Sequence, residues 1–501
     1  MRNYARESRP WLIWLTIIAV IFAGVGIFFY YTFFRQEKSE LIEAIPTDAA
    51  FIFALNDNDG FVKSTASLTP YLNELFLLDA LPAFETMRGK LPDGNYDLTV
   101  SGHTEGDGVS VLFNMHADKA AFKRLLRALS IDPNNYVAFE GNRVYTYGTN
   151  FKSMKFVYVN HIISFSTDID LLTRAIVQHT HPKNLLSDKQ FKEIYNLTEK
   201  NRKQNWLIVN PQGYLSYLNS FLQESSSCRI AKIIGQAGWT AFQLRFSAND
   251  MYLSGYMLTD DTSRKGFCRF LKTPKGEGAD VSELLPYAVN WYADLKNGND
   301  LWDHAMEYHM AHVDEGVAAS MKSLNPSEIS CFSLNADSMD YHYYLALPDT
   351  TYDFLSALYA DTPTADSIRS AHPNGVYPVI NQIVNLMPNL APDTMHWVFV
   401  HGQAIVFAPS MEAVTLFQKT VKNKGTLHQN RYYPFVNEAI ASTSVYHYVL
   451  FNNETLSYLN SLLSDKGKAS NFGEDIRIFS LSCDAMEGDQ HLVPVNLYLH
   501  F

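Results

Sequence analysis

The chain has 501 residues, of which 47% are hydrophobic, 14% aromatic and 18% charged, and its formal net charge is −12. This apolar fraction excludes a disordered chain, and the length leaves room for about two to four domains. The acidic balance argues against nucleic acid as a partner, because binding to phosphates needs clustered lysine and arginine.

The first predicted element is an uncharged, apolar run at residues 11–34, with tryptophans at its start and tyrosines near its end. About 20 apolar residues are enough to cross about 30 Å of hydrocarbon, and aromatic side chains favour the two membrane interfaces. Residues 1–10 hold three arginines and one glutamate, so the positive-inside rule places them in the cytoplasm. The pattern predicts a single-pass transmembrane signal anchor, with residues 35–501 exported.

A cleaved signal peptide is the alternative, because it also begins with a basic segment. The run at residues 11–34 is longer than the apolar region of a signal peptide, and no small-x-small cleavage site follows it. We therefore favour an uncleaved anchor, followed by a juxtamembrane linker at residues 35–44. Residues 1–10 contribute +2 to the net charge of −12, so the exported part carries −14.

An internal repeat runs through the exported part. The segment LSYLNSFL at residues 215–222 recurs as LSYLNSLL at residues 456–463, an offset of 241 residues. The segment EAIP, which begins at Glu43, recurs as ELLP from Glu283, and an aromatic, strand-like stretch follows both. The constant order and nearly constant offset predict a tandem duplication. The two copies, repeat 1 and repeat 2, are placed at residues 45–262 and 284–501.

The hydrophobic patterns of the two copies predict the same elements in the same order. In repeat 1 they are a strand at 51–55, a helical region at 61–81, strands at 96–101 and 110–115, an amphipathic helix at 121–129 behind an Asp118 cap, and a hairpin of 156–159 with 162–165. In repeat 2 they are a strand at 291–295, a helical region at 301–321, strands at 329–334 and 341–347, and a hairpin of 397–400 with 405–407. A strand (206–209 or 448–451), the LSYLNS helix and two terminal strands, the last at 252–258 or 493–501, close each copy. Asn160 and His161, or His401 and Gly402, suit the positive φ values of tight hairpin turns.

Strands that meet through hairpins, with helices between them, predict an α+β fold with mostly antiparallel sheets. The expected architecture is an N-terminal transmembrane helix followed by two tandem homologous α+β domains, paired as a pseudo-symmetric unit with a cleft between them. A basic linker at residues 263–283 joins the domains. We interpret this linker as a solvated connector, and a docking patch for an acidic partner is the alternative.

Catalytic motifs are absent from the sequence, which has no GxSxG elbow, HExxH, Walker A or CxxC pattern. We therefore predict no catalytic, cofactor-binding or metal-binding residues and no cofactor. The best metal candidate is a histidine-rich stretch with His304, Glu307, His309 and His312, which we interpret as solvated histidines because its spacing does not place all four on one helix face. His179 and His181 are interpreted as cations at a helix end.

Two further patterns have an ordinary structural interpretation. The run from Asn56 to Gly60 resembles a calcium loop, but carboxylates are missing where that loop requires its first and last ligands, so a strand-to-helix turn is favoured. The four cysteines, Cys228, Cys268, Cys331 and Cys483, lie far apart. They can form disulfides in an oxidising compartment or remain buried thiols, and the sequence leaves both open.

The segment from Glu43 to Leu55 follows the pattern E-x-I/L-P-x-D-A-x-F-x-F-x-L, with Asp48 replaced by Ala288 in repeat 2. Together with the short basic N-terminus, the single anchor and the duplicated body, it resembles an uncharacterised family of membrane-anchored bacterial cell-envelope proteins. The resemblance implies an inner-membrane protein whose body lies on the periplasmic side. It supplies no catalytic residues.

The functional expectation is a non-enzymatic, membrane-tethered envelope protein whose exported double domain binds a protein or an envelope component. An envelope hydrolase with its active site between the repeats is the alternative. A third possibility is a scaffold that reaches its partners through the membrane helix, where Ala19 and Ala23 form a weak packing motif. An enzyme requires titratable residues that converge on one cleft, whereas a binding module requires an exposed apolar or aromatic patch.

Overall fold

The computed structural model of the chain describes residues 40–55, 97–105, 108–148, 153–180, 183–199, 204–219, 237–247, 249–259, 281–296, 322–336, 339–348, 354–359, 362–379, 393–439, 444–451, 476–484 and 492–501, with a few shorter stretches between them. Within these residues, no helix is both long and apolar enough to span a membrane. The predicted anchor at residues 11–34 lies outside them.

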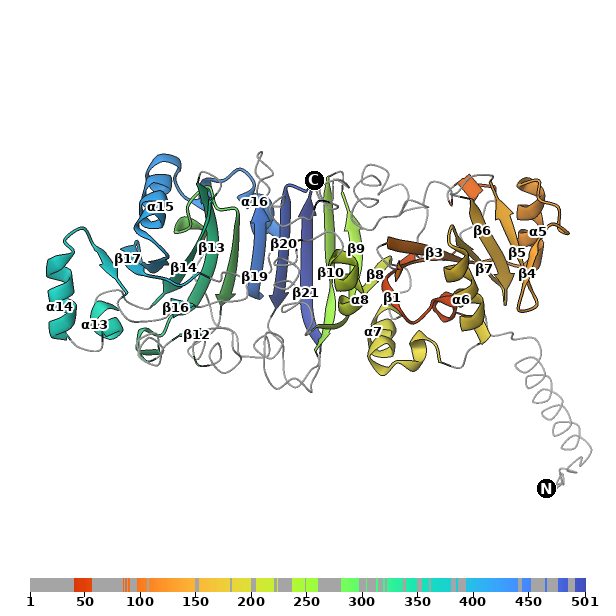
Figure 1. Ribbon diagram of the computed structural model, residues 1–501, viewed down its shortest axis with the longest axis horizontal. Coiled ribbons are helices and arrows are strands. Elements are labelled where there is room, and N and C mark those ends of the chain that lie inside the picture. Colours follow the sequence, from red (N-terminus) through yellow and green to blue (C-terminus); the bar gives the residue numbers. More distant parts are fainter. Residues whose placement is uncertain are drawn as a thin grey trace, which may run out of the picture.

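Nineteen strands of the described chain form one antiparallel sheet that runs along the molecule's long axis (Figure 1). From the outer edge of the first half, the strands are β4 (Val137–Phe139), β5 (Asn142–Tyr147), β6 (Met154–Val159), β7 (Ile162–Ser166), β3 (Gly108–His116), β2 (Leu98–Glu105), β1 (Ala49–Leu55), β8 (Trp206–Val209), β9 (Ala237–Phe246) and β10 (Asp250–Thr259). The second half continues with β21 (Leu492–His500), β20 (Ile478–Asp484), β19 (Ser444–Phe451), β11 (Trp291–Lys296), β13 (Glu328–Ala336), β14 (Met339–Leu347), β18 (Ala404–Ala408), β17 (Trp397–His401) and β15 (Val376–Pro378).

The two halves meet where β10 pairs with β21, with Ser254 opposite Asn496. The strand order outward from this junction is the same in both directions: β10, β9, β8, β1, β2, β3, β7, β6 and β5 on one side, and β21, β20, β19, β11, β13, β14, β18, β17 and β15 on the other. The sheet is therefore continuous from one half to the other, and the C-terminus lies near its middle.

Helices and short 3₁₀ turns connect the strands and cover parts of the sheet. They are η2 (Leu41–Ala44), α5 (Lys119–Ala128), α6 (Ile169–Thr180), η3 (Leu185–Ser187), α7 (Lys189–Glu199), α8 (Pro211–Asn219), η4 (Val281–Glu283), α13 (Phe354–Tyr359), α14 (Thr362–Ala371), α15 (Met411–Lys424), η5 (Leu427–Gln429) and α16 (Tyr433–Ala439). Elements with the same place in the two halves lie at similar offsets. For example, η5 begins 242 residues after η3 (427 − 185), as β18 does after β7 (404 − 162).

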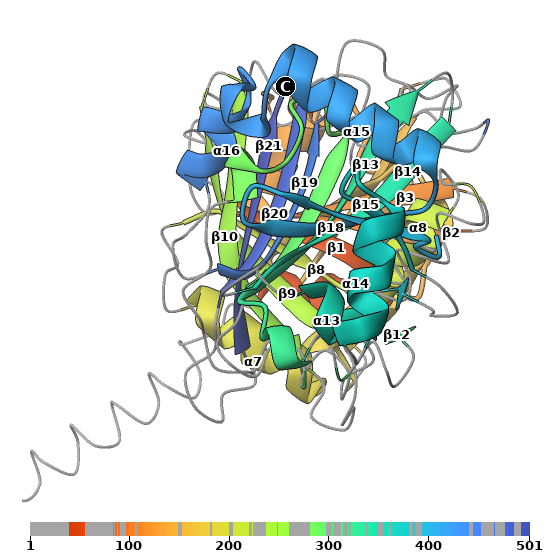
Figure 2. The same cartoon turned by 90° about the vertical axis from the view of Figure 1, so that its left-hand side faces the viewer.

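The hydrophobic core occupies both faces of the sheet. The largest cluster includes residues of both halves and crosses the junction through Leu253 of β10 and Val495 of β21. On the opposite face, α7 covers Trp239 and Leu258, while α16 covers Ile478 and the buried ring of Tyr498. Figure 2 shows α7 and α16 toward opposite ends of that face.

The α+β fold with antiparallel pairing is confirmed, and several local predictions agree with it. Asp118 caps α5 by accepting a hydrogen bond from the backbone N–H of Ala121 at 2.5 Å. The β6–β7 turn holds Asn160 and His161 at φ values of 46° and 66°, as a type I′ turn requires. In the β17–β18 hairpin the turn lies one residue later than predicted, because His401 pairs with Ala404 and Gly402 takes the positive φ of 60°.

One helix prediction is wrong in part. His312–Val313 forms a short strand, β12, that pairs with β16 (Val384–Asn385), so these two residues are not helical as the 301–321 pattern predicted. Their backbone bonds are made to a distant segment, which a local hydrophobic pattern does not detect. Most of the remaining 301–321 region, the 61–81 region and the second LSYLNS segment lie outside the described residues, whereas the first LSYLNS segment overlaps α8.

Candidate functional site

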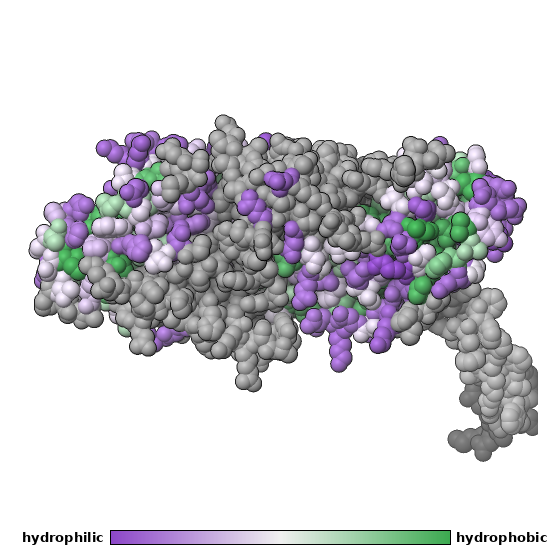
Figure 3. Space-filling model, in the orientation of Figure 1, coloured by the Kyte–Doolittle hydropathy of each residue, from purple (hydrophilic) through white to green (hydrophobic). Residues whose placement is uncertain are grey.

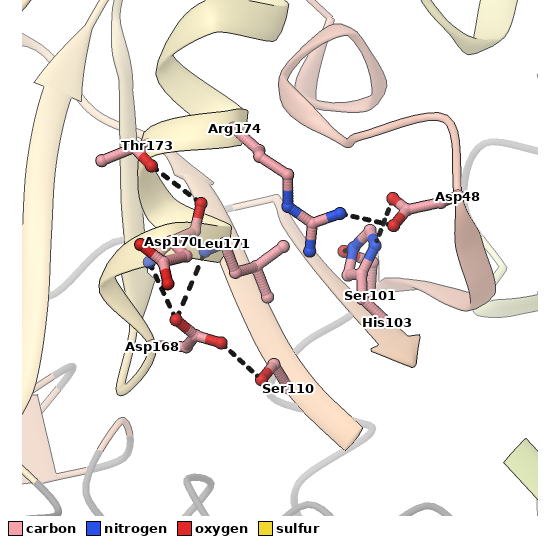
Figure 4. Close-up of polar contacts among 9 residues, drawn as sticks. All are labelled: Asp48, Ser101, His103, Ser110, Asp168, Asp170, Leu171, Thr173 and Arg174. Atoms are coloured by element: carbon pink, nitrogen blue, oxygen red, sulfur yellow. Dashed lines mark hydrogen bonds and ion pairs between the residues drawn. The ribbon is translucent and has the colours of Figure 1, made fainter. Parts of the chain in front are cut away.

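A polar cluster, buried at Ser101 and His103 and half-exposed at Asp48, lies where η2 and β1 meet β2 and α6. Ser101 and His103 are two positions apart on β2, so both side chains point to the same face of the sheet. The Ser101 Oγ lies 3.0 Å from Nε2 of His103, and Nδ1 of His103 lies 3.0 Å from Oδ1 of Asp48. Figure 4 shows the three side chains in this order. The Ser101 and His103 side chains are both 0% exposed.

Arg174 of α6 completes the cluster, because its guanidinium donates to the other carboxylate oxygen of Asp48 at 2.5 Å. Burial opposes ionisation of Asp48, but His103 and Arg174 outweigh it and hold the Asp48 pKa below its usual range. Burial lowers the pKa of His103 despite the attraction of the Asp48 carboxylate. A neutral His103 can donate a hydrogen bond from Nδ1 to the Asp48 carboxylate and accept one at Nε2 from the Ser101 hydroxyl. In this tautomer Ser101, His103 and Asp48 all have hydrogen-bond partners.

The order of these contacts is that of a serine hydrolase, in which a histidine connects the nucleophile to a carboxylate. Such a serine must also be reachable by the substrate, and Ser101 is not exposed. As it stands, the cluster is a polar connection inside the fold that joins the entrance of β1 to β2 and α6.

The second half replaces this cluster with apolar residues. Ser101 pairs with Ile52 of β1, and the residue in the same register of β11 and β13 is Phe332, which pairs with Tyr292. The same alignment places Ala288 at the position of Asp48 and Leu334 at the position of His103. Leu416 is at the position of Arg174. The polar groups are thus all present in one half and all absent from the other, which indicates that they act as a unit. The sequence interpretation recorded the change at Asp48 but missed Ser101, His103 and Arg174, which comparison of the two proposed repeats at these positions could have found.

A second candidate site lies on the open sheet face between α7 and α16. Cross-strand partners point to the same face, and the pairings of β10 with β9 and β21 place six side chains together. We call this surface the junction strip: Gln243, Arg245, Tyr252, Ser254, Tyr256 and Asn496. Tyr252 and Tyr256 are 37% and 42% exposed, values that are high for aromatic residues in the middle of a sheet.

One end of the junction strip continues into an aromatic cluster. The ring of Tyr252 lies 4.8 Å from that of Tyr498, and the ring of Phe435, which is 41% exposed on α16, stacks on His500 at 5.0 Å. Beneath these rings, the Asp250 carboxylate accepts a hydrogen bond from the Tyr498 hydroxyl at 2.8 Å and lies 2.8 Å from Nδ1 of His500. Burial and the Asp250 carboxylate raise the pKa of Tyr498, so its hydroxyl remains protonated.

The second half also contains buried histidines next to carboxylates, which the sequence interpretation missed. His447 of β19 is opposite Asp294 of β11, which accepts a hydrogen bond from Ser330, and burial lowers the His447 pKa to about 3. His342 of β14 lies 2.7 Å from the Asp393 carboxylate and 3.4 Å from that of Asp340. Burial opposes its protonation, but the two carboxylates prevail and raise the His342 pKa to about 9.

The residues singled out from the sequence do not gather at either site. His304, Glu307, His309, His181 and the Asn56–Gly60 run lie outside the described residues, and His312 is on β12. The interpretation of His179 as a cation at a helix end is wrong, because burial lowers its pKa to about 4. Cys331 and Cys483 are buried free thiols, and Cys228 and Cys268 lie outside the described part. In that part, no group of three or more acidic, histidine or cysteine side chains is arranged to hold a metal ion.

An apolar area is visible in Figure 3 at the end of the molecule that holds α6. Ile169 and Val177 are the large apolar residues exposed on that helix. Isolated aliphatic residues of this kind are common on protein surfaces, so this area carries less weight than the aromatic junction strip.

Comparison of the sequence with protein-family models and with curated proteins finds no match. Among solved structures, crystal forms I, III and IV of TP0453 are similar to part of the chain, with 9–10% identity and TM-scores of 0.26–0.27. The matches cover 43–49% of this chain and 79–92% of the TP0453 chains. A likeness at this TM-score carries no argument about the fold or function of this protein.

Proposed function

We propose that this protein is a membrane-tethered component of a bacterial cell envelope, whose exported body binds a protein or an envelope ligand through the junction strip. The observation that carries the proposal is the exposure of Tyr252 and Tyr256 on a strand that is paired on both sides. Large aromatic rings are normally buried in a sheet, and exposed rings beside polar groups are typical of recognition surfaces.

The proposed body consists of two tandem homologous α+β domains. The identical strand order on both sides of the junction and the recurring offset of 242 residues support this duplication. If the halves are related copies, the junction strip lies at their interface and combines strands from both. The uncharged run at residues 11–34 supports the tether, which would leave the body outside the cytoplasmic membrane.

Binding is tested by site-specific photo-crosslinking with the full, membrane-anchored chain in cells. We expect a photoreactive residue at Tyr256 to give a discrete crosslinked species that the same residue at Tyr136 does not give, because Tyr136 is 37% exposed in the loop just before the distant edge strand β4. Identical products from both positions, or no product from either Tyr252 or Tyr256, would contradict the proposal. The tether is tested separately, since deletion of residues 11–34 should release the chain from the membrane fraction.

A hydrolase is the second candidate, and the Ser101–His103–Asp48 contact order is the observation in its favour. The absence of exposure at Ser101 weighs against it. Incubation of the full chain with a fluorophosphonate probe distinguishes the two functions. The binding proposal expects no labelling of Ser101, whereas labelling that is lost in Ser101→Ala but retained in Ser110→Ala would establish the hydrolase.

A further inference from the structure

We infer that the junction strip recognises an uncharged glycan chain, an inference that rests on the binding function proposed above and specifies its ligand. The first support is the type of surface. Tyr252 and Tyr256 are four residues apart on β10, about 13 Å along a strand, and both rings are exposed between the helices α7 and α16. Two separated flat rings suit a ligand with several ring-shaped apolar faces.

The second support is the polar chemistry between the two rings. Ser254 lies between Gln243 of β9 and Asn496 of β21 in one row across the junction. All three side chains are partly exposed. Hydroxyl and amide side chains both donate and accept hydrogen bonds. Sugar hydroxyls need partners of this mixed kind, while the C–H faces of sugar rings can lie against tyrosine rings.

The third support is charge. The strip itself contains one charged side chain, Arg245, whose guanidinium contacts the Gln243 amide oxygen at 3.4 Å. Asp250 and Glu438, at the Tyr252 end, act electrostatically on that ring and add negative charge. A third carboxylate, that of Asp484, lies 3.4 Å from the amide nitrogen of Asn496. The described charges at the strip are therefore one positive and three negative, which disfavours a polyanion, and the uncharged hydroxyl and amide groups at its centre favour an uncharged ligand.

Peptide binding by strand addition does not fit the surface. β10 is hydrogen-bonded to β9 on one side and to β21 on the other, so the strip offers a sheet face and no free strand edge. An amphipathic helix requires a continuous apolar groove, and the row of Gln243, Ser254 and Asn496 interrupts the apolar surface between the tyrosines.

The test uses the full chain in nanodiscs and isothermal titration calorimetry with three hexasaccharides: β-1,4-linked glucose, β-1,4-linked N-acetylglucosamine and, as the charged comparison, galacturonic acid. At least one neutral hexamer should bind, and more tightly than the galacturonic acid hexamer. Tyr252→Ala with Tyr256→Ala should weaken binding by roughly tenfold or more. The Tyr252→Phe with Tyr256→Phe variant, which keeps both rings, should retain most of the affinity, and Tyr136→Ala should change nothing.

The inference is overturned if neither neutral hexamer binds, if the charged hexamer binds as tightly, or if the double alanine variant binds normally. The thermal unfolding midpoint of each variant should equal that of the wild type, which excludes loss of folding as the cause of weak binding. A protein crosslinked at Tyr256, without hexasaccharide binding, would overturn the glycan inference and leave the binding function standing. Failure of both experiments would remove both proposals.

Discussion

The Asp48 carboxylate and the Nδ1 atom of His103 lie 3.0 Å apart, although 55 residues separate them in the chain. This contact fixes the segment that enters β1 against the neighbouring strand β2, and the Arg174 guanidinium fixes the same carboxylate to α6. Asp48, which directly precedes β1, therefore connects three elements: β1, β2 and α6. His103 is buried, so a broken contact would leave its N–H without an acceptor and without water. Asp48 is half-exposed and could bind water instead, so most of the lost free energy would come from the histidine.

His103→Leu should destabilise the protein by about 1–3 kcal/mol, because the buried Ser101 hydroxyl loses its hydrogen-bond partner. Leucine is the residue at the corresponding position of the second half. Asp48→Ala should have a similar effect by removing the acceptor of the His103 N–H. The triple variant Asp48→Ala/His103→Leu/Arg174→Leu should cost less than the sum of the three single changes, because the contacts of Asp48 with His103 and Arg174 are each lost in two of the single variants and are counted twice in that sum. Urea unfolding midpoints measure these differences. Strict additivity would show that the cluster does not act as a unit.

The pKa of His103 also predicts how stability depends on pH. Burial lowers this pKa in the folded state, so the unfolded chain binds the proton more readily below about pH 6.5. The contribution of His103 to stability should be fully present above that pH and should decline as the pH falls from 7 towards 5. His447 acts in the same direction, because its folded pKa is about 3. His103→Leu and His447→Leu should each flatten the decline, by up to about 1.4 kcal/mol per pH unit. A pH profile that is unchanged in both variants would contradict this prediction.

His342 predicts the opposite pH dependence. The carboxylates of Asp393 and Asp340 stabilise its protonated form, and its folded pKa is about 9. Its contribution to stability is fully present below the unfolded pKa of about 6.5 and should be lost as the pH rises through about 9. Asp393→Asn should move the ring titration of His342, followed by NMR, to lower pH. The same change at Asp366, which is on α14 and pairs with Arg369, serves as the control and should leave it unmoved.

Local patterns predicted much of the fold because many of its elements are set by short-range chemistry. The Asp118 cap and the Asn160–His161 turn depend on residues next to each other in the chain, and the structure places both as predicted. The pairing of β10 with β21 joins segments about 240 residues apart and leaves no periodic signal in either strand. The local patterns predicted two paired domains with a cleft between them, and a single sheet that continues from one half to the other was beyond their reach.

The candidate sites were harder to predict for the same reason. Ser101, His103, Asp48 and Arg174 come from three distant segments, and none belongs to a known catalytic spacing. Core packing is the ordinary role of aromatic residues in strands, and it holds for Phe51 and Trp291 but fails for Tyr252 and Tyr256. Period-two alternation places a side chain on one face of a strand, but whether a helix covers that face depends on tertiary packing.

The buried thiols predict a simple chemical test. Cys331 and Cys483 are both free and buried, and burial raises the Cys331 pKa well above its usual value. Thiolates react far faster than thiols. In a Cys228→Ser/Cys268→Ser background, a maleimide reagent should therefore modify neither residue until urea unfolds the chain, and should then modify both. Rapid modification of the native protein, or a mass that indicates a disulfide between the two, would contradict the structure.

Gly255 tests how closely β9 and β10 pair beside the junction. It is opposite Phe242 of β9 and Val495 of β21, and a Cβ atom added to it would come within 1.8 Å of the Ala241 carbonyl oxygen. The obstacle is backbone, so Gly255→Ala must push β9 and β10 apart. We expect a loss of about 1–3 kcal/mol in unfolding free energy and weaker binding at the junction strip. Ser254→Ala, one position away and partly exposed, is the matched control for stability and should unfold near the wild-type midpoint. Equal urea midpoints for the two variants would mean that the β9–β10 contact is looser than the structure indicates.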